Sequence, residues 1–240
     1  MIVSFVQTKG GTGKSTLALN LAFSNVMQKA FESIALIEFD PQGTLRDWWQ
    51  AREENHWQTK KVSFHHISST QKEVVQDGIK SINLHNELLI VDTPGESTGK
   101  LHTKIACAIS DLVVIPTRSS TNEELALSNK LLPILKEIIK INAHKQGGFY
   151  VLPAFVNSRS SKDKIIQYFE DILPSYVECM GSVYPMRSVY ENFNREGMAL
   201  QEYIKSVEKN RRVFQQASKA VSDVEEIAKN ILERLNNRQV

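Results

Sequence analysis

Apolar residues along the chain follow two alternating patterns. Short, nearly continuous apolar runs are typical of strands covered on both faces, and longer segments with helical spacing separate them. The predicted strands are residues 2–6, 33–39, 62–67, 87–92, 111–116, 149–156 and a weaker candidate at 178–184. The predicted helices are residues 14–29, 43–54, 69–82, 98–109, 122–142, 161–172 and about 210–236. The alternation predicts an α/β fold with a mostly parallel sheet of about seven strands and helices on both faces.

Two residues interrupt these helical patterns. Pro133 lies inside the segment 122–142 and should kink that helix or divide it in two, because proline lacks the backbone N–H that a helix interior requires. Asn210 lies just before the last predicted helix and is a good N-cap residue. The basic residues on either side of Asn210 therefore belong either to one continuous helix or to two.

Length, composition and charge narrow the class of protein. The 240 residues, 41% of them apolar, predict a single domain over residues 1–240, and a net charge of +2 identifies no partner. Cys107 and Cys179 stand apart from each other and from histidine pairs, which argues against a zinc site and predicts reduced thiols in a cytoplasmic protein. We expect no membrane-spanning segment, because no apolar run approaches the length of a transmembrane helix.

The segment QTKGGTGKST follows directly on the first predicted strand and leads into a helix. Gly10, Gly11 and Gly13 allow a tight turn whose backbone N–H groups point inward, and such a turn at a helix N-terminus binds phosphate. Lys14 is then placed to reach the β- and γ-phosphates, and the hydroxyl of Ser15 is placed to contact Mg²⁺. The order of strand, glycines, Lys-Ser-Thr and helix predicts a nucleotide-binding loop.

This loop departs from the general pattern G-x-x-x-x-G-K at one position, where Thr8 replaces glycine and is followed by a second lysine, Lys9. The segment KGGTGKST thereby resembles the deviant phosphate loop of the ParA/MinD family of dimeric ATPases. The resemblance implies a P-loop NTPase fold, ATP and Mg²⁺ as ligands, and a homodimer in which Lys9 crosses to the partner's nucleotide. The nucleotide-binding residues that it implies in this loop are Lys9, Gly10, Gly11, Thr12, Gly13, Lys14, Ser15 and Thr16.

Two further segments end predicted strands beside this loop. The segment EFDPQG resembles the family pattern D-x-D-P-Q-G, whose second aspartate is catalytic, so Asp40 is the candidate that orients the attacking water; Glu38 replaces the first aspartate and receives no role. The segment LLIVDTPG places Asp92 where it can hold Mg²⁺ through water. Gly95 then offers a backbone N–H to the γ-phosphate, and residues 95–100 would form a switch. The catalytic candidates are Lys9, Lys14 and Asp40, and the metal candidates are Ser15, Asp40 and Asp92.

Candidates for contact with the base come from the later part of the chain. Asn157 or Arg159 follows the strand 149–156, and the segment YPMRSVYENFNREGMAL resembles the family loop that lines adenine, which nominates Pro185 and Met186. The guanine signature N-K-x-D is missing, because Asn129-Lys130 continues as Leu-Leu. ATP is therefore favoured over GTP.

The resemblance implies a cytoplasmic, nucleoid-associated bacterial ATPase that dimerises on ATP, binds DNA without sequence preference and acts in plasmid or chromosome partition or positioning. Turnover should be slow without a ParB-like adaptor, since no arginine finger is evident. Residues 195–219 include six basic and three acidic residues. On one continuous helix most of the basic side chains would lie along one face, where they could neutralise DNA phosphates. The DNA-binding candidates are Lys205, Lys209, Arg211, Arg212 and Lys219.

Three alternatives remain open at this point. A VirC-type ATPase of conjugative DNA transfer would carry similar motifs. A MinD-like ATPase would associate with a membrane through a C-terminal amphipathic helix, but four acidic residues in the tail of this chain oppose an anionic lipid surface. We therefore expect the tail to pack on its own domain and expect no membrane partner. A dethiobiotin-synthetase-like enzyme would need a substrate pocket that sequence does not reveal.

Overall fold

The computed structural model describes residues 1–95, 100–141, 148–157, 159–191 and 193–238. Its strands are β1 (Ile2–Phe5), β2 (Ile34–Glu38), β3 (Val62–His66), β4 (Leu88–Asp92), β5 (Leu112–Thr117), β6 (Phe149–Val156), β7 (Glu178–Cys179) and β8 (Tyr184–Pro185). The sheet has the order β3-β2-β4-β1-β5-β6-β7, β8 also pairs with β6, and every pair is parallel. The predicted parallel sheet is confirmed, but the candidate strand 178–184 is two short strands that both pair with β6.

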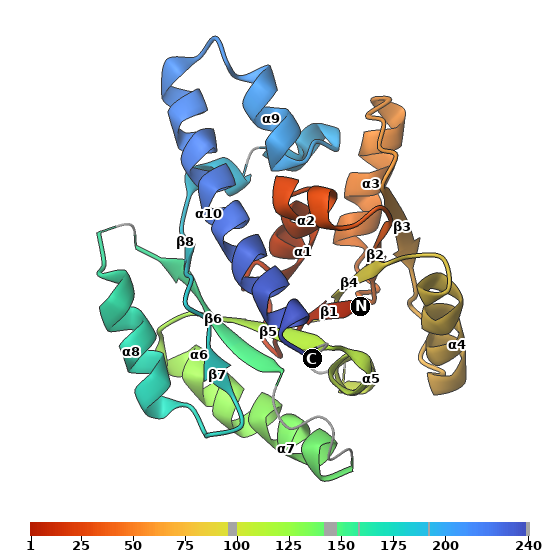
Figure 1. Ribbon diagram of the computed structural model, residues 1–240, viewed down its shortest axis with the longest axis vertical. Helices are drawn as coiled ribbons and strands as arrows, with labels where there is room; N and C mark the ends of the chain where they lie inside the picture. The colour runs from red at the N-terminus through yellow and green to blue at the C-terminus, as the bar shows by residue number, and fades with distance from the viewer. Residues whose placement is uncertain (96–99, 142–147, 158, 192, 239–240) are drawn as a thin grey trace.

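Helices cover both faces of this sheet (Figure 1). One face carries α1 (Lys14–Ala22), α2 (Asn25–Ala30) and α10 (Arg211–Asn236), with α3 (Thr44–Glu54) and α9 (Leu200–Ser206) beside them. The opposite face carries α4 (Lys72–Asn83), α5 (Lys100–Ile109), α6 (Thr121–Ala126), α7 (Leu132–Ile141) and α8 (Lys162–Ile172). The three-layer arrangement follows from strands that are apolar on both sides.

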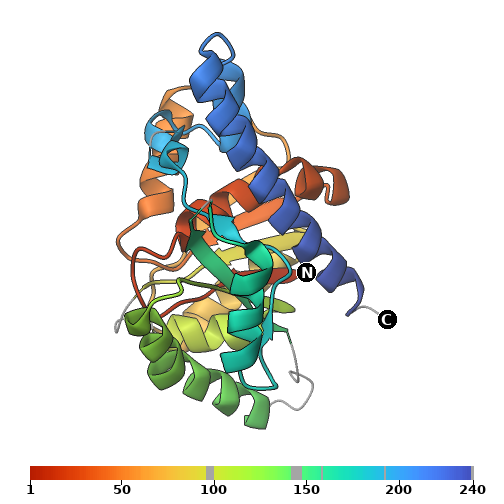
Figure 2. The ribbon, with the colours of Figure 1, turned by 90° about the vertical axis from the view of Figure 1, so that its left-hand side faces the viewer.

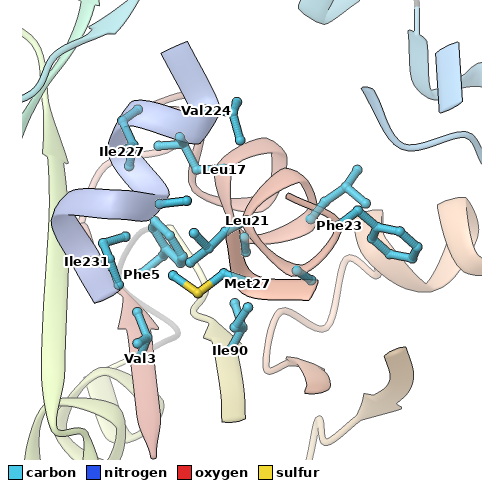
Figure 3. Close-up of a cluster of buried hydrophobic side chains, with 14 of the residues drawn as sticks. Val3, Phe5, Leu17, Leu21, Phe23, Met27, Ile90, Val224, Ile227 and Ile231 are labelled. Carbon is cyan, nitrogen blue, oxygen red and sulfur yellow. The ribbon is translucent and has the colours of Figure 1, made fainter. Parts of the chain in front are cut away.

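The alternation of side chains along each strand divides the core into two clusters. In β1, Val3 and Phe5 face α1 and α10, whereas Val6, just beyond the strand, packs in the cluster on the other face. Figure 3 shows Phe5 beside Leu17 of α1 and Ile231 of α10. The strand that precedes the phosphate loop is thus fixed from both sides.

Two predicted helices are interrupted in the structure. The segment 14–29 breaks at Ser24, whose hydroxyl accepts the N–H of Met27 at 3.2 Å and starts α2. The segment 122–142 is helical through Ile141, but a π-helical turn at Leu127–Leu131 interrupts its α-helical pattern just before Pro133, the residue expected to disturb it.

The carboxyl ends of the central strands meet at one edge of the sheet. Asp92, the last residue of β4, is in register with Phe5 of β1 on one side and with Glu38 of β2 on the other. The loops that follow β1, β2 and β4 therefore emerge side by side, which is the usual ligand site of an open parallel sheet.

Candidate functional site

The loop between β1 and α1 has the backbone of a phosphate loop. Gly11 and Gly13 have φ angles of 73° and 83°, in the left-handed region that favours glycine, and Gly13 is the N-cap of α1. A Cβ atom at Gly13 would lie 2.9 Å from Cε1 of Tyr184 and 3.3 Å from the ring of Phe155. Glycine at position 13 is therefore required by both conformation and space.

A cavity of about 720 Å³ lies against this loop, and three loops at the edge of the sheet line it. Its lining residues are Gly10, Gly11, Thr12, Gly13, Lys14, Ser15, Thr16, Asp40, Pro41, Gln42, Thr44, Thr93, Pro94 and Gly95. The structure thus brings the candidates from Gly10 to Thr16 together with Asp40 and Gly95 in a space large enough for a nucleotide, whereas Lys9 and Asp92 are not among the lining residues.

Lys14 lines the cavity and interacts electrostatically with the buried Asp92 at the end of β4. Burial lowers the pKa of Lys14, and the nearby charges of Asp92, Asp40 and Glu123 partly offset this shift. Burial raises the pKa of the fully buried Asp92 to about 7, against the opposing effects of Lys14 and of the hydrogen bond from Ser15. A buried lysine beside glycine N–H groups forms a positive floor for an anionic ligand.

The residues beneath the cavity fit a Mg²⁺ ion. The hydroxyl of Ser15 donates to Oδ2 of Asp92 at 2.5 Å, while Oδ1 of Asp92 is buried without a hydrogen-bond partner among the described residues. Among all the described residues, no group of three His, Cys, Asp or Glu side chains could by itself hold a metal ion. Mg²⁺ commonly uses one or two protein ligands together with phosphate and water, so this pair suits it.

Asp40 and Glu38 have different surroundings. Oδ1 of Asp40 accepts the N–H of Gln42 at 2.9 Å in the turn that lines the cavity. The buried carboxylate of Glu38 accepts the N–H groups of Leu45 and Arg46 at 2.8 and 3.0 Å, at the start of α3. Burial raises the pKa of Glu38, and these two hydrogen bonds oppose that rise. Glu38, for which the sequence motif indicated no role, thus caps the helix that follows the Asp40 turn.

Gly95 packs directly on the phosphate loop. A Cβ atom at Gly95 would lie 2.9 Å from Cα and 3.1 Å from the amide nitrogen of Gly10. Residues 96–99 of the predicted switch lie outside the described residues. The close approach of two glycines explains why a side chain is excluded where the loop after β4 meets the loop after β1.

Lys9 directly precedes the residues that line the cavity and is not itself one of them. Its side chain is 41% exposed, and its Nζ lies 3.9 Å from Oε1 of Glu123, which is 3% exposed. Arg118, which the sequence did not nominate, donates from Nη2 to the carbonyl of Gly11 at 2.6 Å, and its guanidinium lies 3.9 Å from the ring centroid of Phe155. Its position directly after β5 was the only sequence signal that pointed to it.

A family profile described as the CobQ/CobB/MinD/ParA nucleotide binding domain matches residues 3–236. The chain belongs to this family. The match includes the phosphate loop, the Asp40 turn and β4 with its following loop. The ParA/MinD resemblance drawn from the sequence is confirmed.

Individual relatives agree with this assignment. The chain is 29% identical over 116 residues to the maintenance of carboxysome distribution protein A of Gloeobacter kilaueensis, a stretch that is 48% of each protein. Two solved structures share the fold. A substituted McdA of Cyanothece in complex with ATP has a TM-score of 0.59 at 16% identity, with 93% of this chain and 95% of the other covered. The pNOB8 ParA has a TM-score of 0.64 at 15% identity, with 98% of each chain covered.

Candidate base contacts of this ParA/MinD-family chain lie outside the cavity lining. Met186 donates its N–H to the carbonyl of Val156 at 2.9 Å, so the ends of β6 and β8 are neighbours and bring Asn157 close to Pro185. Met186 is 64% exposed. Oδ1 of Asn157 accepts the N–H of Arg159 at 3.0 Å, as in an Asx turn. These candidates gather at one edge, but none of them lines the phosphate cavity.

The five basic candidates for DNA contact do not lie on one continuous helix. α9 ends at Ser206, and the side chain of Asn210 accepts the N–H of Val213 at 3.3 Å and starts α10. The basic residues on either side of Asn210 therefore belong to two helices and the connection between them, not to one continuous helix. Lys205, Lys209, Arg211, Arg212 and Lys219 are all outside the buried core. Figures 1 and 2 show that the connection between α9 and α10 lies at the opposite end of the molecule from α7.

The C-terminal helix packs on its own domain, as expected. Val224, Ile227 and Ile231 of α10 are buried in the core, and Glu225 accepts the N–H groups of Asn25 and Val26 of α2. None of the described helices is both long and apolar enough to span a bilayer. The apolar stripe of α10 is therefore already covered by protein.

Proposed function

We propose that this chain is a Mg²⁺-dependent ATPase of the ParA type that forms a dimer when it binds ATP and then binds DNA without sequence preference. The observation that carries the proposal is the separation of the two lysines of the loop. Lys14 is buried and lines the cavity, while Lys9 is not among the lining residues and 41% of its side chain is exposed. A lysine in that position is available to a second protomer placed against the open side of the site.

The chemistry within one protomer follows from the cavity. Backbone N–H groups of the loop and Lys14 would hold the phosphates, and Asp40 would orient the attacking water from the adjacent turn. Ser15 and Asp92 would hold Mg²⁺, which when bound neutralises phosphate charge. Gly95, packed on Gly10, would offer its backbone N–H to the γ-phosphate.

The DNA interaction is proposed on charge and exposure. The basic candidates around the α9–α10 connection lie outside the core, and none of them forms an ion pair with another described residue. Accessible lysine and arginine side chains bind DNA phosphates with release of counterions, so DNA binding should weaken steeply as the salt concentration rises. Two-fold pairing would place two such surfaces on one assembly. By resemblance to its family, such an assembly would act in partition or positioning with an adaptor protein, in the cytoplasm over the nucleoid.

The test measures assembly and DNA binding with ATP, ADP or no nucleotide. Molar mass is followed by light scattering, and DNA binding by fluorescence anisotropy at two salt concentrations. We expect dimers and salt-sensitive DNA binding with ATP and Mg²⁺ alone. Lys9→Ala should abolish both, whereas Lys136→Ala, which removes an exposed lysine of α7, should change neither. A monomer under every condition, or DNA binding that is equally strong with ATP, with ADP and without nucleotide, would refute the proposal.

A further inference from the structure

Glu123 is a buried carboxylate in the first turn of α6, beside the outer face of the phosphate loop. Its side chain is 3% exposed, although glutamate is rarely buried without charged partners. Oε1 lies 3.9 Å from Nζ of Lys9 and 3.7 Å from Nε of Arg118, and Oε2 accepts the backbone N–H of Arg118 at 3.2 Å. One buried anion thus faces both cations that flank the loop.

These cations are attached to the loop itself. Lys9 is part of it, and Arg118 donates to the carbonyl of Gly11 while its guanidinium lies over the ring of Phe155. The charge of Glu123 also acts on Lys14 at the floor of the cavity. Glu123 is therefore close enough for its charge to reach the space in which nucleotide phosphates would bind, and it holds the positive groups that such phosphates would attract.

We propose that Glu123 is a positioning residue of the site, which retains Lys9 and Arg118 beside the phosphate loop of their own protomer and competes with nucleotide phosphate for them. The part of this proposal in which Glu123 keeps Lys9 from a partner protomer rests on the proposed function. The part in which Glu123 competes with nucleotide phosphate does not. Phosphate entering the cavity meets an opposing negative charge, and an ATP-driven dimer forms only after Lys9 leaves Glu123. Glu123 thus sets the nucleotide concentration at which the protein assembles.

The test compares Glu123→Gln with Glu123→Asp and with Glu124→Gln. The first keeps the size and the acceptor oxygen but removes the charge, the second keeps the charge, and the third removes a charge whose side chain faces Tyr168 of α8 instead. Dissociation constants for ADP and ATP are measured at low and high salt, and assembly is followed by light scattering. ADP serves as the probe of competition because we expect it to bind without driving assembly.

We expect Glu123→Gln to bind ADP and ATP about threefold to tenfold more tightly at low salt, with a smaller difference at high salt, because the effect is electrostatic. It should also assemble at lower ATP concentration, while the other two variants match the unmodified protein. Unchanged or weaker ADP binding by a folded Glu123→Gln would overturn the proposal. If wild-type protein fails to assemble with ATP, the proposed function fails, and the ADP measurement still decides the role of Glu123.

A second variant covers the case in which Glu123→Gln does not fold. Lys9→Gln leaves Glu123 with one cation fewer and does not alter α6. It should weaken ADP binding several-fold at low salt, because less of the opposing charge is neutralised. If Lys9→Gln binds ADP as tightly as the unmodified protein, the proposed competition is wrong.

Discussion

The interaction of Arg52 with Glu202 offers a stability prediction that the structure makes quantitative. Arg52 of α3 is 1% exposed and donates to both carboxylate oxygens of Glu202 of α9 at 2.7 Å. Its guanidinium also donates to the carbonyl of Gly197 and lies 4.6 Å from the ring centroid of Phe23. This ion pair joins the helix after the Asp40 turn to the helix that leads into the proposed DNA-binding region.

Replacement of Glu202 by glutamine should leave the buried guanidinium without its counter-charge. Breaking a buried pair costs about 3–5 kcal/mol, and because Glu202 is 21% exposed we expect about 2–4 kcal/mol here. That is a large part of the roughly 5–15 kcal/mol by which a domain is stable. For a chain of this size the loss corresponds to a fall in melting temperature of about 5–15 °C.

The assay is urea unfolding followed by circular dichroism, with thermal melting as a second measurement. Glu208→Gln is the matched control, because Glu208 is an exposed acid between the same α9 and the following α10, and its effect should stay within about 0.5 kcal/mol. If Glu202→Gln loses no more stability than Glu208→Gln, the pair does not hold α3 to α9 as argued.

Three further predictions follow from the site. Gly95→Ala should weaken ATP binding by about tenfold or more while leaving a folded protein, because its methyl group would displace Gly10; calorimetric affinity equal to that of the unmodified protein would contradict this. Because burial raises the pKa of Asp92 to about 7, the native state binds this proton more tightly than the unfolded state. The stability of the nucleotide-free protein should therefore fall as the pH rises from about 4 to about 7, and Asp92→Asn should flatten that fall in urea titrations at several pH values; an unchanged slope would refute the assignment. Charge reversal at Lys209 and Arg212 together should reduce DNA affinity and the slope of its salt dependence without changing ATP binding, and an unaltered slope would place the DNA surface elsewhere.

The fold and the phosphate-binding part of the site were predictable because both depend on local signals. Apolar runs identified the central strands, and the loop from Gly10 to Ser15 indicates its turn and its helix through residue types alone. Pro133 likewise marked the interruption of its helix. The weak strand candidate at 178–184 is two short strands in the structure, because pairing with β6, rather than local pattern, decides where β7 and β8 lie.

The remaining parts of the site depend on contacts between residues distant in the sequence. Arg118 reaches Gly11, and Glu123 faces Lys9, only because β5 lies next to β1 in the sheet. Glu38 caps α3 across a turn, an arrangement that its position in a buried strand does not indicate. A local motif identifies the residues that contact a phosphate, whereas the order of the strands determines which charged side chains lie next to that motif.

A mixing experiment tests most directly whether Lys9 acts on the partner's nucleotide. Lys9→Ala and Asp40→Ala proteins, each inactive alone, are combined in equal amounts with ATP and Mg²⁺, and phosphate release is measured. If Lys9 acts in trans, each mixed dimer contains one complete site and one site that lacks both residues, so the mixture should regain turnover that neither protein shows alone. If the mixture stays as inactive as its two components, Lys9 does not act across the interface and the central claim is wrong.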